Sequence, residues 1–183
     1  MLDAAERLLA ASKGRRLILS DVAAEVGMSQ SYAHRFFPRK ADLVRALALR
    51  WFAEVEAEAD RIVAADLPAQ GALRAYILTI LKLKRDRFDA DPALFRAYLT
   101  LAQDHMDIVQ IHTAHLSDGL RSILARLVPA HAVDAALALV EDATARFRIP
   151  MMIAAQRHLA TDARAEAVLE MLCAQLGAGA PNH

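Results

Sequence analysis

The sequence predicts an all-α fold, with three short helices followed by about six longer ones. Three observations support this class. Alanine and leucine are abundant, and apolar residues recur at intervals of three and four. Runs of β-branched residues are few, and the strict alternation typical of strands is missing. Prolines and glycines fall between the periodic segments, where they separate successive helices.

The segment 19–40 contains two short helical stretches joined by a glycine turn. Small side chains at Ala23 and Ala33 allow the two helices to cross closely. Gly27 takes the turn, because most other residues would pay a penalty for its left-handed backbone. Ser29 is a favoured N-cap for the helix that follows. This is the arrangement of a helix-turn-helix DNA reader.

The second helix of this segment is expected to be about two turns long, from Gln30 to Phe36 or Phe37. It ends there because Pro38 disfavours helical geometry at the residue before it. Its polar side chains can reach base edges or phosphates of DNA. These side chains belong to Gln30, Ser31, Tyr32, His34 and Arg35.

Residues 2–47 resemble the DNA-binding domain of the TetR family of one-component transcriptional regulators. The resemblance lies in the order and spacing of the turn at Gly27, the short helix and the sequence from Phe37 to Lys40. It implies that the positions of His34 and Lys40 contact the phosphate backbone. The full set of expected DNA-contacting residues is Ser29, Gln30, Ser31, Tyr32, His34, Arg35, Arg39 and Lys40.

Three departures from the family pattern bear on the strength of DNA binding. His34 replaces the usual tyrosine, and Arg39 replaces the usual serine, which removes an N-cap but adds a cation beside Lys40. Met1 falls inside the expected first helix. The basic arm that usually precedes this helix is therefore either absent or encoded ahead of this start.

The charge of the chain is unevenly distributed although its formal net charge is zero. Residues 1–50 contain nine Lys or Arg and five Asp or Glu, a net charge of +4, which leaves −4 for the remainder. A basic region joined to an acidic one is the asymmetry expected of a protein that docks on DNA at one end.

The rest of the chain is expected to be helical, because its apolar residues keep the helical spacing. Helices are expected at residues 41–65, 70–88, 92–105, 108–128, 133–159 and 162–176. Asp91 and Thr161 are expected N-caps, and Pro150 should kink or split the helix that contains it. Gly177 should end the last helix, followed by a frayed tail. The predicted domains are 1–45, which binds DNA, and 46–183, which binds an effector and dimerises.

The TetR resemblance implies that the second domain encloses a small-molecule effector and pairs its last two helices with a second subunit. A two-turn reading helix contacts too few bases to be selective alone, so two copies on a palindromic operator are expected. Their centres should lie about 34–36 Å apart. Two apolar stripes fit either this interface or the chain's own core: Val133, Ala136, Leu137 and Val140, then Val168, Leu169, Leu172 and Leu176.

The effector pocket is expected among large or pliable apolar side chains, which also suit an ordinary core. These residues are Tyr76, Phe95, Tyr98, Met106, Phe147, Met151 and Met152. Arg148 is unusual among its apolar neighbours. It is expected either to face an anionic ligand or to pair with Glu141 or Asp142.

A competing hypothesis starts from His105, His112 and His115. Three imidazoles can bind a divalent metal, which would make the protein a metal-responsive regulator or a metal-dependent helical enzyme. The sequence contains no HExxH, glycine-rich phosphate loop or CxxC motif. We therefore expect no enzymatic activity, no cofactor and no metal. A helical scaffold without DNA binding would be favoured if Arg35 and Lys40 had no role with nucleic acid.

The chain is expected to work in the cytoplasm. It has no apolar stretch long enough to span a membrane, and its N-terminus lacks the pattern of a secretory leader. Its one cysteine, Cys173, excludes an internal disulfide framework. The sequence thus favours a homodimeric, TetR-like transcriptional repressor that a small molecule releases from its operator.

Overall fold

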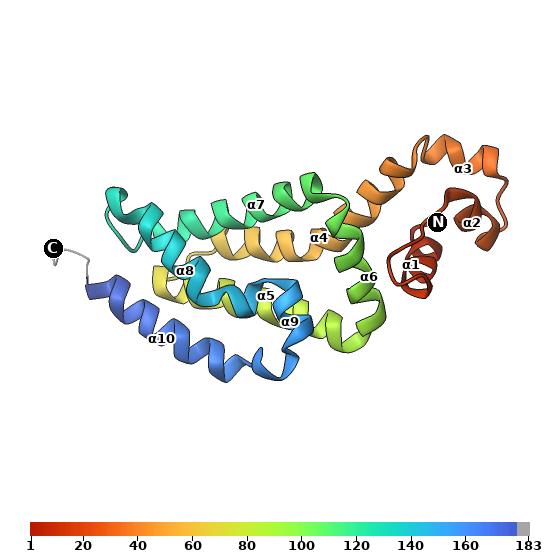
Figure 1. Cartoon of the computed structure of the whole chain (residues 1–183). Helices are drawn as coiled ribbons and strands as arrows, with labels where there is room; N and C mark the ends of the chain where they lie inside the picture. Colours follow the sequence, from red (N-terminus) through yellow and green to blue (C-terminus); the bar gives the residue numbers. More distant parts are fainter. Residues whose placement is uncertain (179–183) are drawn as a thin grey trace. The chain divides into compact units, whose positions relative to one another are not determined.

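The computed structural model describes residues 1–178, and within them the chain is helical with no strand (Figure 1). The α-helices are α1 (Leu2–Ala11), α2 (Leu19–Glu25), α3 (Gln30–Phe36), α4 (Lys40–Ala64), α5 (Ala69–Ala90), α6 (Pro92–Gln103), α7 (Met106–Leu124), α8 (Val133–Arg148), α9 (Pro150–Ala155) and α10 (Asp162–Ala178). Two short 3₁₀ turns lie at Ala130–Ala132 and Arg157–Leu159. The predicted all-α class is confirmed.

The chain forms two compact units. Unit 1 consists of Met1–Glu54 and Phe88–Ile111, and unit 2 consists of Val55–Arg87 and the residues from His112 onward. Helices α4, α5 and α7 each contribute residues to both units. The predicted functional boundary after residue 45 stays a prediction. The sequence did not indicate that residues 88–111 would join the N-terminal residues.

Helix α6 completes the core of unit 1 by packing on α1. Ala4, Ala5 and Leu9 of α1 share this core with Ala97, Tyr98 and Leu101 of α6. The ring of Trp51 stacks on Tyr98 with 4.0 Å between ring centroids. The Tyr98 hydroxyl donates a hydrogen bond to Glu6, 2.8 Å away. Apolar burial and one partly buried hydrogen bond therefore attach a mid-chain helix to the first helix.

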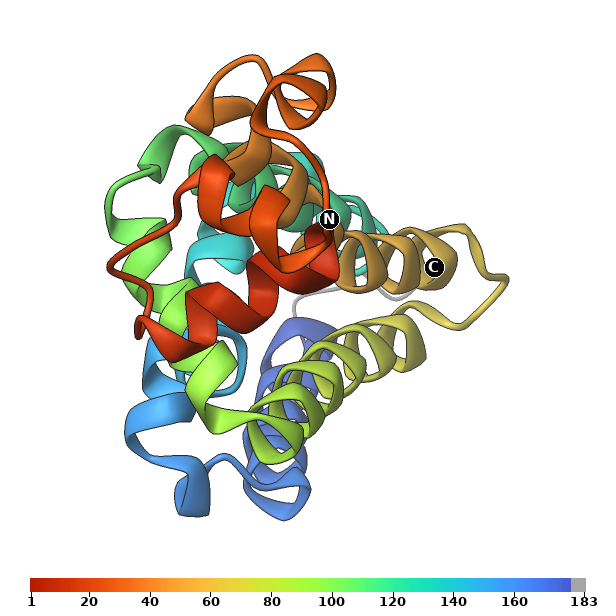
Figure 2. The same ribbon diagram turned by 90° about the vertical axis from the view of Figure 1, so that its right-hand side faces the viewer.

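Unit 2 is built around α5, whose buried face carries Leu73, Tyr76, Ile77 and Leu81. These side chains share one core with residues of α7, α8 and α10. Helices α5 and α10 lie side by side (Figure 2), and two ion pairs join them, Arg74–Glu166 and Arg85–Asp162. Both pairs are partly exposed, so burial of the apolar faces provides most of the stabilisation.

Three local signals in the sequence have the predicted effect. The Asp91 carboxylate accepts a hydrogen bond from the backbone N–H of Leu94 at 2.8 Å, which caps α6. Pro150 begins α9, and the extended residue Ile149 separates α9 from α8. The Thr161 hydroxyl accepts a weaker bond from the N–H of Arg164 at 3.4 Å, at the start of α10.

Two predicted helix ends are wrong. Helix α7 ends at Leu124, four residues before Val128, because the chain tightens into a turn in which the Leu127 N–H donates to the Leu124 carbonyl at 2.8 Å. Gly177 lies inside α10, which runs to Ala178. The rest of the predicted frayed tail, residues 179–183, lies outside the described residues. Across residues 1–178, no helix combines the length and the apolar character needed to cross a membrane.

Candidate functional site

The helix-turn-helix segment has the predicted geometry in unit 1. Ala23 and Ala33 are both buried where α2 and α3 meet. Gly27 has a φ of +67°, the left-handed conformation expected of the turn. The Met28 N–H donates to the Ala23 carbonyl at 2.9 Å, which satisfies an open carbonyl at the end of α2. The Ser29 hydroxyl accepts from the Tyr32 N–H at 3.2 Å and caps α3.

Helix α3 presents nearly its whole surface to solvent. Ala33 is its one buried residue, which anchors the helix on α2. All of the expected DNA-contacting side chains are exposed: Ser29, Gln30, Ser31, Tyr32, His34, Arg35, Arg39 and Lys40. Such a helix buries too little apolar surface to be explained by packing, so its polar residues are free to contact a partner.

The two cations at the start of α4, Arg39 and Lys40, differ in their partners. The guanidinium of Arg39 binds the Asp42 carboxylate at 3.3 and 3.1 Å, and the Arg39 N–H donates to the same group at 2.9 Å. Arg39 holds the pKa of Asp42 below its usual value. Among the described residues Lys40 forms no ion pair. Lys40 therefore offers the less compensated charge to a phosphate.

One exposed aromatic residue of α3 was not among the predicted contacts. Phe36 is 53% exposed and meets the Tyr32 ring edge-on, with 5.2 Å between centroids. The Arg35 guanidinium lies over the Tyr32 ring, 5.9 Å from its centroid. An apolar ring on a reading helix can contact the methyl group of thymine. The available signal was the spacing of Tyr32 and Phe36, which are four residues apart and therefore share one side of the helix.

Unit 2 contains a cavity of ≈ 380 Å³ between α5, α7, α8 and the start of α9. Its lining combines apolar walls with a few charged groups, the composition typical of small-molecule sites of this size. The lining residues are Ile80, Lys84, Thr113, Leu116, Ser117, Glu141, Asp142, Ala145, Arg148, Ile149 and Pro150.

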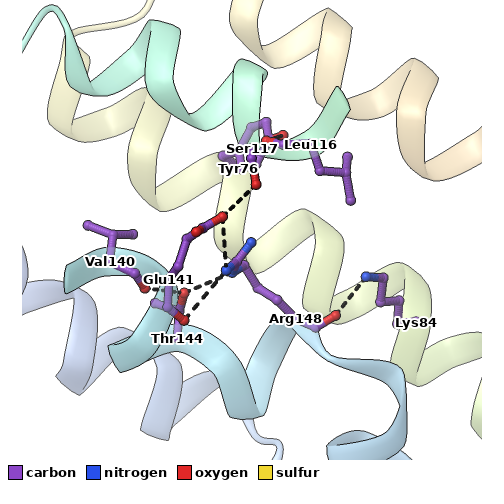
Figure 3. A network of polar contacts seen from close by, with 8 residues as sticks. All are labelled: Tyr76, Lys84, Leu116, Ser117, Val140, Glu141, Thr144 and Arg148. Atoms are coloured by element: carbon purple, nitrogen blue, oxygen red, sulfur yellow. Dashed lines mark hydrogen bonds and ion pairs between the residues drawn. The ribbon is translucent and has the colours of Figure 1, made fainter. Parts of the chain in front are cut away.

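A polar network lies along one side of this cavity (Figure 3). The guanidinium of Arg148 pairs with Glu141 at 3.6 Å and donates to the Thr144 hydroxyl at 3.0 Å. The Ser117 hydroxyl donates to the same Glu141 carboxylate at 2.6 Å. Burial lowers the pKa of Arg148 below its ordinary value, while Glu141 opposes this effect. Of the two predicted roles of Arg148, the structure shows the pairing with Glu141.

Lys84 is the other cation of the cavity, and sequence reasoning missed it. The residue is only 8% exposed, and its ammonium donates to the carbonyl of Arg148 at 2.6 Å. Burial and two neighbouring cations lower its pKa from 10.5 to about 7. The signal was present in the sequence. Lys84 follows Ile77 and Leu81 at helical spacing, so it occupies a position of the buried stripe of α5.

The predicted effector residues do not surround one cavity. Arg148 lines it, and Tyr76 and Phe147 are buried in the core of unit 2. The Tyr76 hydroxyl donates to the Leu116 carbonyl at 2.6 Å, and burial raises the pKa of this phenol. The other predicted residues are placed as follows: Phe95 and Tyr98 in the core of unit 1, Met106 and Met151 exposed, and Met152 partly buried. They were chosen for apolar bulk, which fills cores as readily as it lines pockets.

The three histidines of the metal hypothesis do not form a ligand cluster. Nδ1 of His112 lies 2.7 Å from Glu56, and Nε2 of His115 lies 2.9 Å from Asp60. Burial lowers the pKa of His112 to about 4 despite its carboxylate partner. His105 belongs to unit 1. Within residues 1–178 no three His, Cys, Asp or Glu side chains are arranged to hold a metal ion, so the structure gives this hypothesis no support.

The two apolar stripes proposed for a subunit interface are largely occupied by the chain's own packing. The stripe of α8 and most of that of α10 are buried within the single chain: Val133, Ala136, Leu137 and Val140, then Leu169, Leu172 and Leu176, with Val168 partly buried. The exposed apolar side chains of these helices are different ones. Leu139 of α8 is 44% exposed and Met171 of α10 is 75% exposed.

Comparisons with known proteins agree with the helical arrangement. The family described as "Tetracyclin repressor-like, C-terminal domain" matches residues 69–169. The chain is similar to the solved structure of PfmR, a TetR family transcriptional regulator from Thermus thermophilus, at 16% identity and a TM-score of 0.59, covering 99% of this chain and 98% of that one. LfrR, a TetR-like regulator from Mycobacterium smegmatis, is 21% identical, with a TM-score of 0.46 over 100% of this chain and 94% of that one. No curated protein sequence matches the chain.

Proposed function

The chain belongs to the tetracycline-repressor-like (TetR) family of transcriptional regulators, and from this membership we propose that it is a homodimeric repressor with a palindromic operator and a small-molecule effector. Regulators of this family bind DNA and dimerise, and they are generally not enzymes. The observation that carries the proposal is helix α3, capped by Ser29 and anchored by Ala33, with all its other side chains exposed.

Each exposed residue of the interface has a proposed role. Gln30, Ser31, Tyr32 and Arg35 read base edges in the major groove, because amide, hydroxyl and guanidinium groups match their donors and acceptors. His34 and Lys40 bind phosphates and set the position of the helix on the duplex. Arg39 adds a second cation, weakened by its bond to Asp42, and Ser29 orients the helix by capping it. Phosphate contacts of this kind set affinity, and base contacts set selectivity.

Two subunits are needed because one short reading helix contacts few bases. We propose that the second subunit docks on the surface that contains Leu139 and Met171, the exposed apolar side chains of α8 and α10. A hollow of ≈ 280 Å³ lined by Leu139, Gln175 and Leu176 among others adjoins this surface. In the proposed dimer the two copies of α3 occupy half-sites about 34–36 Å apart.

The effector is proposed to act through α4. This helix begins at Lys40, in the DNA interface, and its later residues Glu56 and Asp60 bind His112 and His115 of α7. The same helix α7 supplies Leu116 and Ser117 to the cavity. A ligand that favours a different position of α7 would shift α4, and the spacing of the two reading helices would no longer fit the operator.

Replacing Lys40 with alanine should weaken binding to DNA of any sequence and reduce its dependence on salt. Each phosphate that a cation neutralises releases counterions, so removing one such cation should lower the slope of log K against log salt by about 0.9. The measurement is fluorescence anisotropy with a mixed-sequence duplex at several salt concentrations. A mixed sequence suffices because phosphate binding does not depend on the operator.

Lys82→Ala is the matched control, since Lys82 is also an exposed lysine and lies in α5, in unit 2. Its slope should equal that of the wild type. An unchanged slope for Lys40→Ala would remove Lys40 from the phosphate role, and absence of DNA binding by the wild-type chain at low salt would overturn the proposed function.

Introducing Leu139→Glu together with Met171→Glu should convert the dimer into a monomer. Two carboxylates per subunit would face each other across an apolar contact, where burying them unpaired is costly. Sedimentation equilibrium gives the mass directly. Met106→Glu with Ile111→Glu is the control, because these residues are also exposed and apolar but lie in unit 1. If the first variant remains dimeric, the subunits associate through another surface.

A further inference from the structure

The cavity of unit 2 contains a buried cation that no acid compensates. Arg148 has Glu141 as a partner at 3.6 Å, so these two charges offset each other. Among the described residues Lys84 forms no ion pair, and its one hydrogen bond is to a backbone carbonyl. The charges that act on it come from Arg148 and Arg87. Asp142 also lines the cavity, but it is exposed to solvent.

A purely structural role would not require a lysine here. The carbonyl of Arg148 is at the end of α8, and Lys84 satisfies it with one of three N–H donors. A neutral amide would serve that carbonyl without placing a positive charge in a buried position, which is costly when unpaired. The remaining donors of Lys84 adjoin the cavity, whose other walls include Ile80, Leu116 and Ile149.

We propose that this cavity binds a small amphipathic carboxylate, whose anionic group pairs with Lys84 and whose apolar body packs on Ile80, Leu116 and Ile149. The proposal rests on the proposed function in that it names the chemical class of the effector. A carboxylate supplies the charge and the acceptors that Lys84 lacks. The cavity of ≈ 380 Å³ accommodates an aromatic or short aliphatic acid.

A cationic ligand fits the same walls less well. The Glu141 carboxylate already accepts from Ser117 at 2.6 Å and pairs with Arg148. A cation would have to displace these partners and also approach Lys84. The lowered pKa of Lys84 agrees with this assignment, since a group held near neutrality regains its proton when an anion arrives.

The test is isothermal titration calorimetry of the full chain, without DNA, with two matched pairs of probes: cinnamate and cinnamamide, and octanoate and octanamide. Each pair differs mainly in charge. At least one carboxylate should bind about tenfold more tightly than its amide, the effect expected of a hydrogen bond to a charged group. Lys84→Met should abolish that preference while the affinity for the amide stays within about twofold.

Two further variants separate charge from folding and from hydrogen bonding. Lys84→Gln retains a donor for the Arg148 carbonyl but has no charge, and it should also lose the preference. Lys82→Met removes an exposed lysine of the same helix, and this variant should keep the preference for the carboxylate. The proposal is overturned if neither carboxylate binds at millimolar concentration, if the amides or cinnamylamine bind as tightly as the acids, or if Lys84→Met keeps the preference.

This experiment is independent of the DNA test. A chain that binds cinnamate through Lys84 but fails to bind DNA would retain the ligand site and refute the repressor function. A chain whose DNA binding depends on Lys40 but which binds none of the carboxylates would keep the function and refute this effector class.

Discussion

Replacing Gly14 with alanine should destabilise the chain by about 2 to 5 kcal/mol. Gly14 has a φ of +79°, which an alanine adopts at a cost of about 1–2 kcal/mol. An added Cβ would also lie 2.7 Å from the Cβ of Thr100 and closer still to the carbonyl oxygen of Ala97. That oxygen belongs to the backbone of α6, so the overlap cannot be relieved by rotating a side chain. Urea unfolding at equilibrium measures the loss.

Gly27→Ala is the control for the backbone contribution. Gly27 has a similar φ of +67°, but a Cβ there would meet nothing within 4 Å. Its loss should therefore be limited to about 1–2 kcal/mol. The difference between the two variants measures how closely α6 approaches Gly14. Equal losses would show that α6 moves aside at little cost, contrary to the packing described for unit 1.

Lys84→Met should stabilise the ligand-free chain by about 2 to 4 kcal/mol at pH 7. Lowering the pKa of Lys84 from 10.5 to about 7 means that its protonated form is disfavoured in the fold by on the order of 5 kcal/mol. Methionine has a similar volume and no charge, so this cost disappears. The missing hydrogen bond to the Arg148 carbonyl offsets about 1 kcal/mol of the gain. A substitution that stabilises the protein and removes ligand recognition is typical of a binding site.

Urea unfolding of wild type and variant at pH 7, 8 and 9 checks the prediction. Lys82→Met again serves as the control, and its effect should not change with pH, because Lys82 is exposed beside Asp86. A variant that is less stable than the wild type at pH 7 would show that Lys84 stabilises the fold, which would contradict the cost assigned to its burial.

The gain should depend on pH in a defined direction. Between pH 7 and pH 9 the unfolded chain keeps Lys84 protonated, while the folded chain has largely lost that proton. Since the unfolded chain binds more protons, the wild-type fold is stabilised relative to the variant by about 1.4 kcal/mol for each pH unit of increase. The ionisable groups near Lys84 should not produce the same pH dependence of stability. His112, with a pKa of about 4, is neutral over this range, and the guanidinium groups of Arg148 and Arg87 remain protonated.

The sequence predicted features that depend on one or two neighbouring residues. Gly27, Ser29 and Asp91 act through their own backbone or through a bond three residues away, so their roles could be read locally. Pro150 separates α8 from α9 through an equally local effect. Gly177 misled the prediction, because a glycine ends a helix only when the chain turns. Here α10 includes Gly177 and runs to Ala178, and a Cβ at Gly177 would stand 3.0 Å from the Gln70 amide nitrogen.

Features that depend on distant segments were not predictable in the same way. The attachment of α6 to α1 pairs residues about ninety positions apart, such as Glu6 and Tyr98. No local pattern marks Tyr98 as a partner of the first helix rather than of a ligand. Lys84 was missed because an isolated lysine on a helix is usually solvated, although its place in the buried stripe distinguished it. Prediction from apolar bulk picked out residues of the core, whereas the feature that distinguishes the cavity is the buried charge of Lys84.

The composition of unit 1 also has a consequence for the order of events during synthesis. The apolar face of α1, with Ala4, Ala5 and Leu9, is covered by Ala97, Tyr98 and Leu101. A ribosome adding about 5–20 residues per second needs several seconds to pass from the end of α3 to the end of α6. During that interval the emerging reading helix has an incomplete core. The proposed binding to DNA should therefore require that α6 has emerged, and chains that terminate before α6 should not bind DNA.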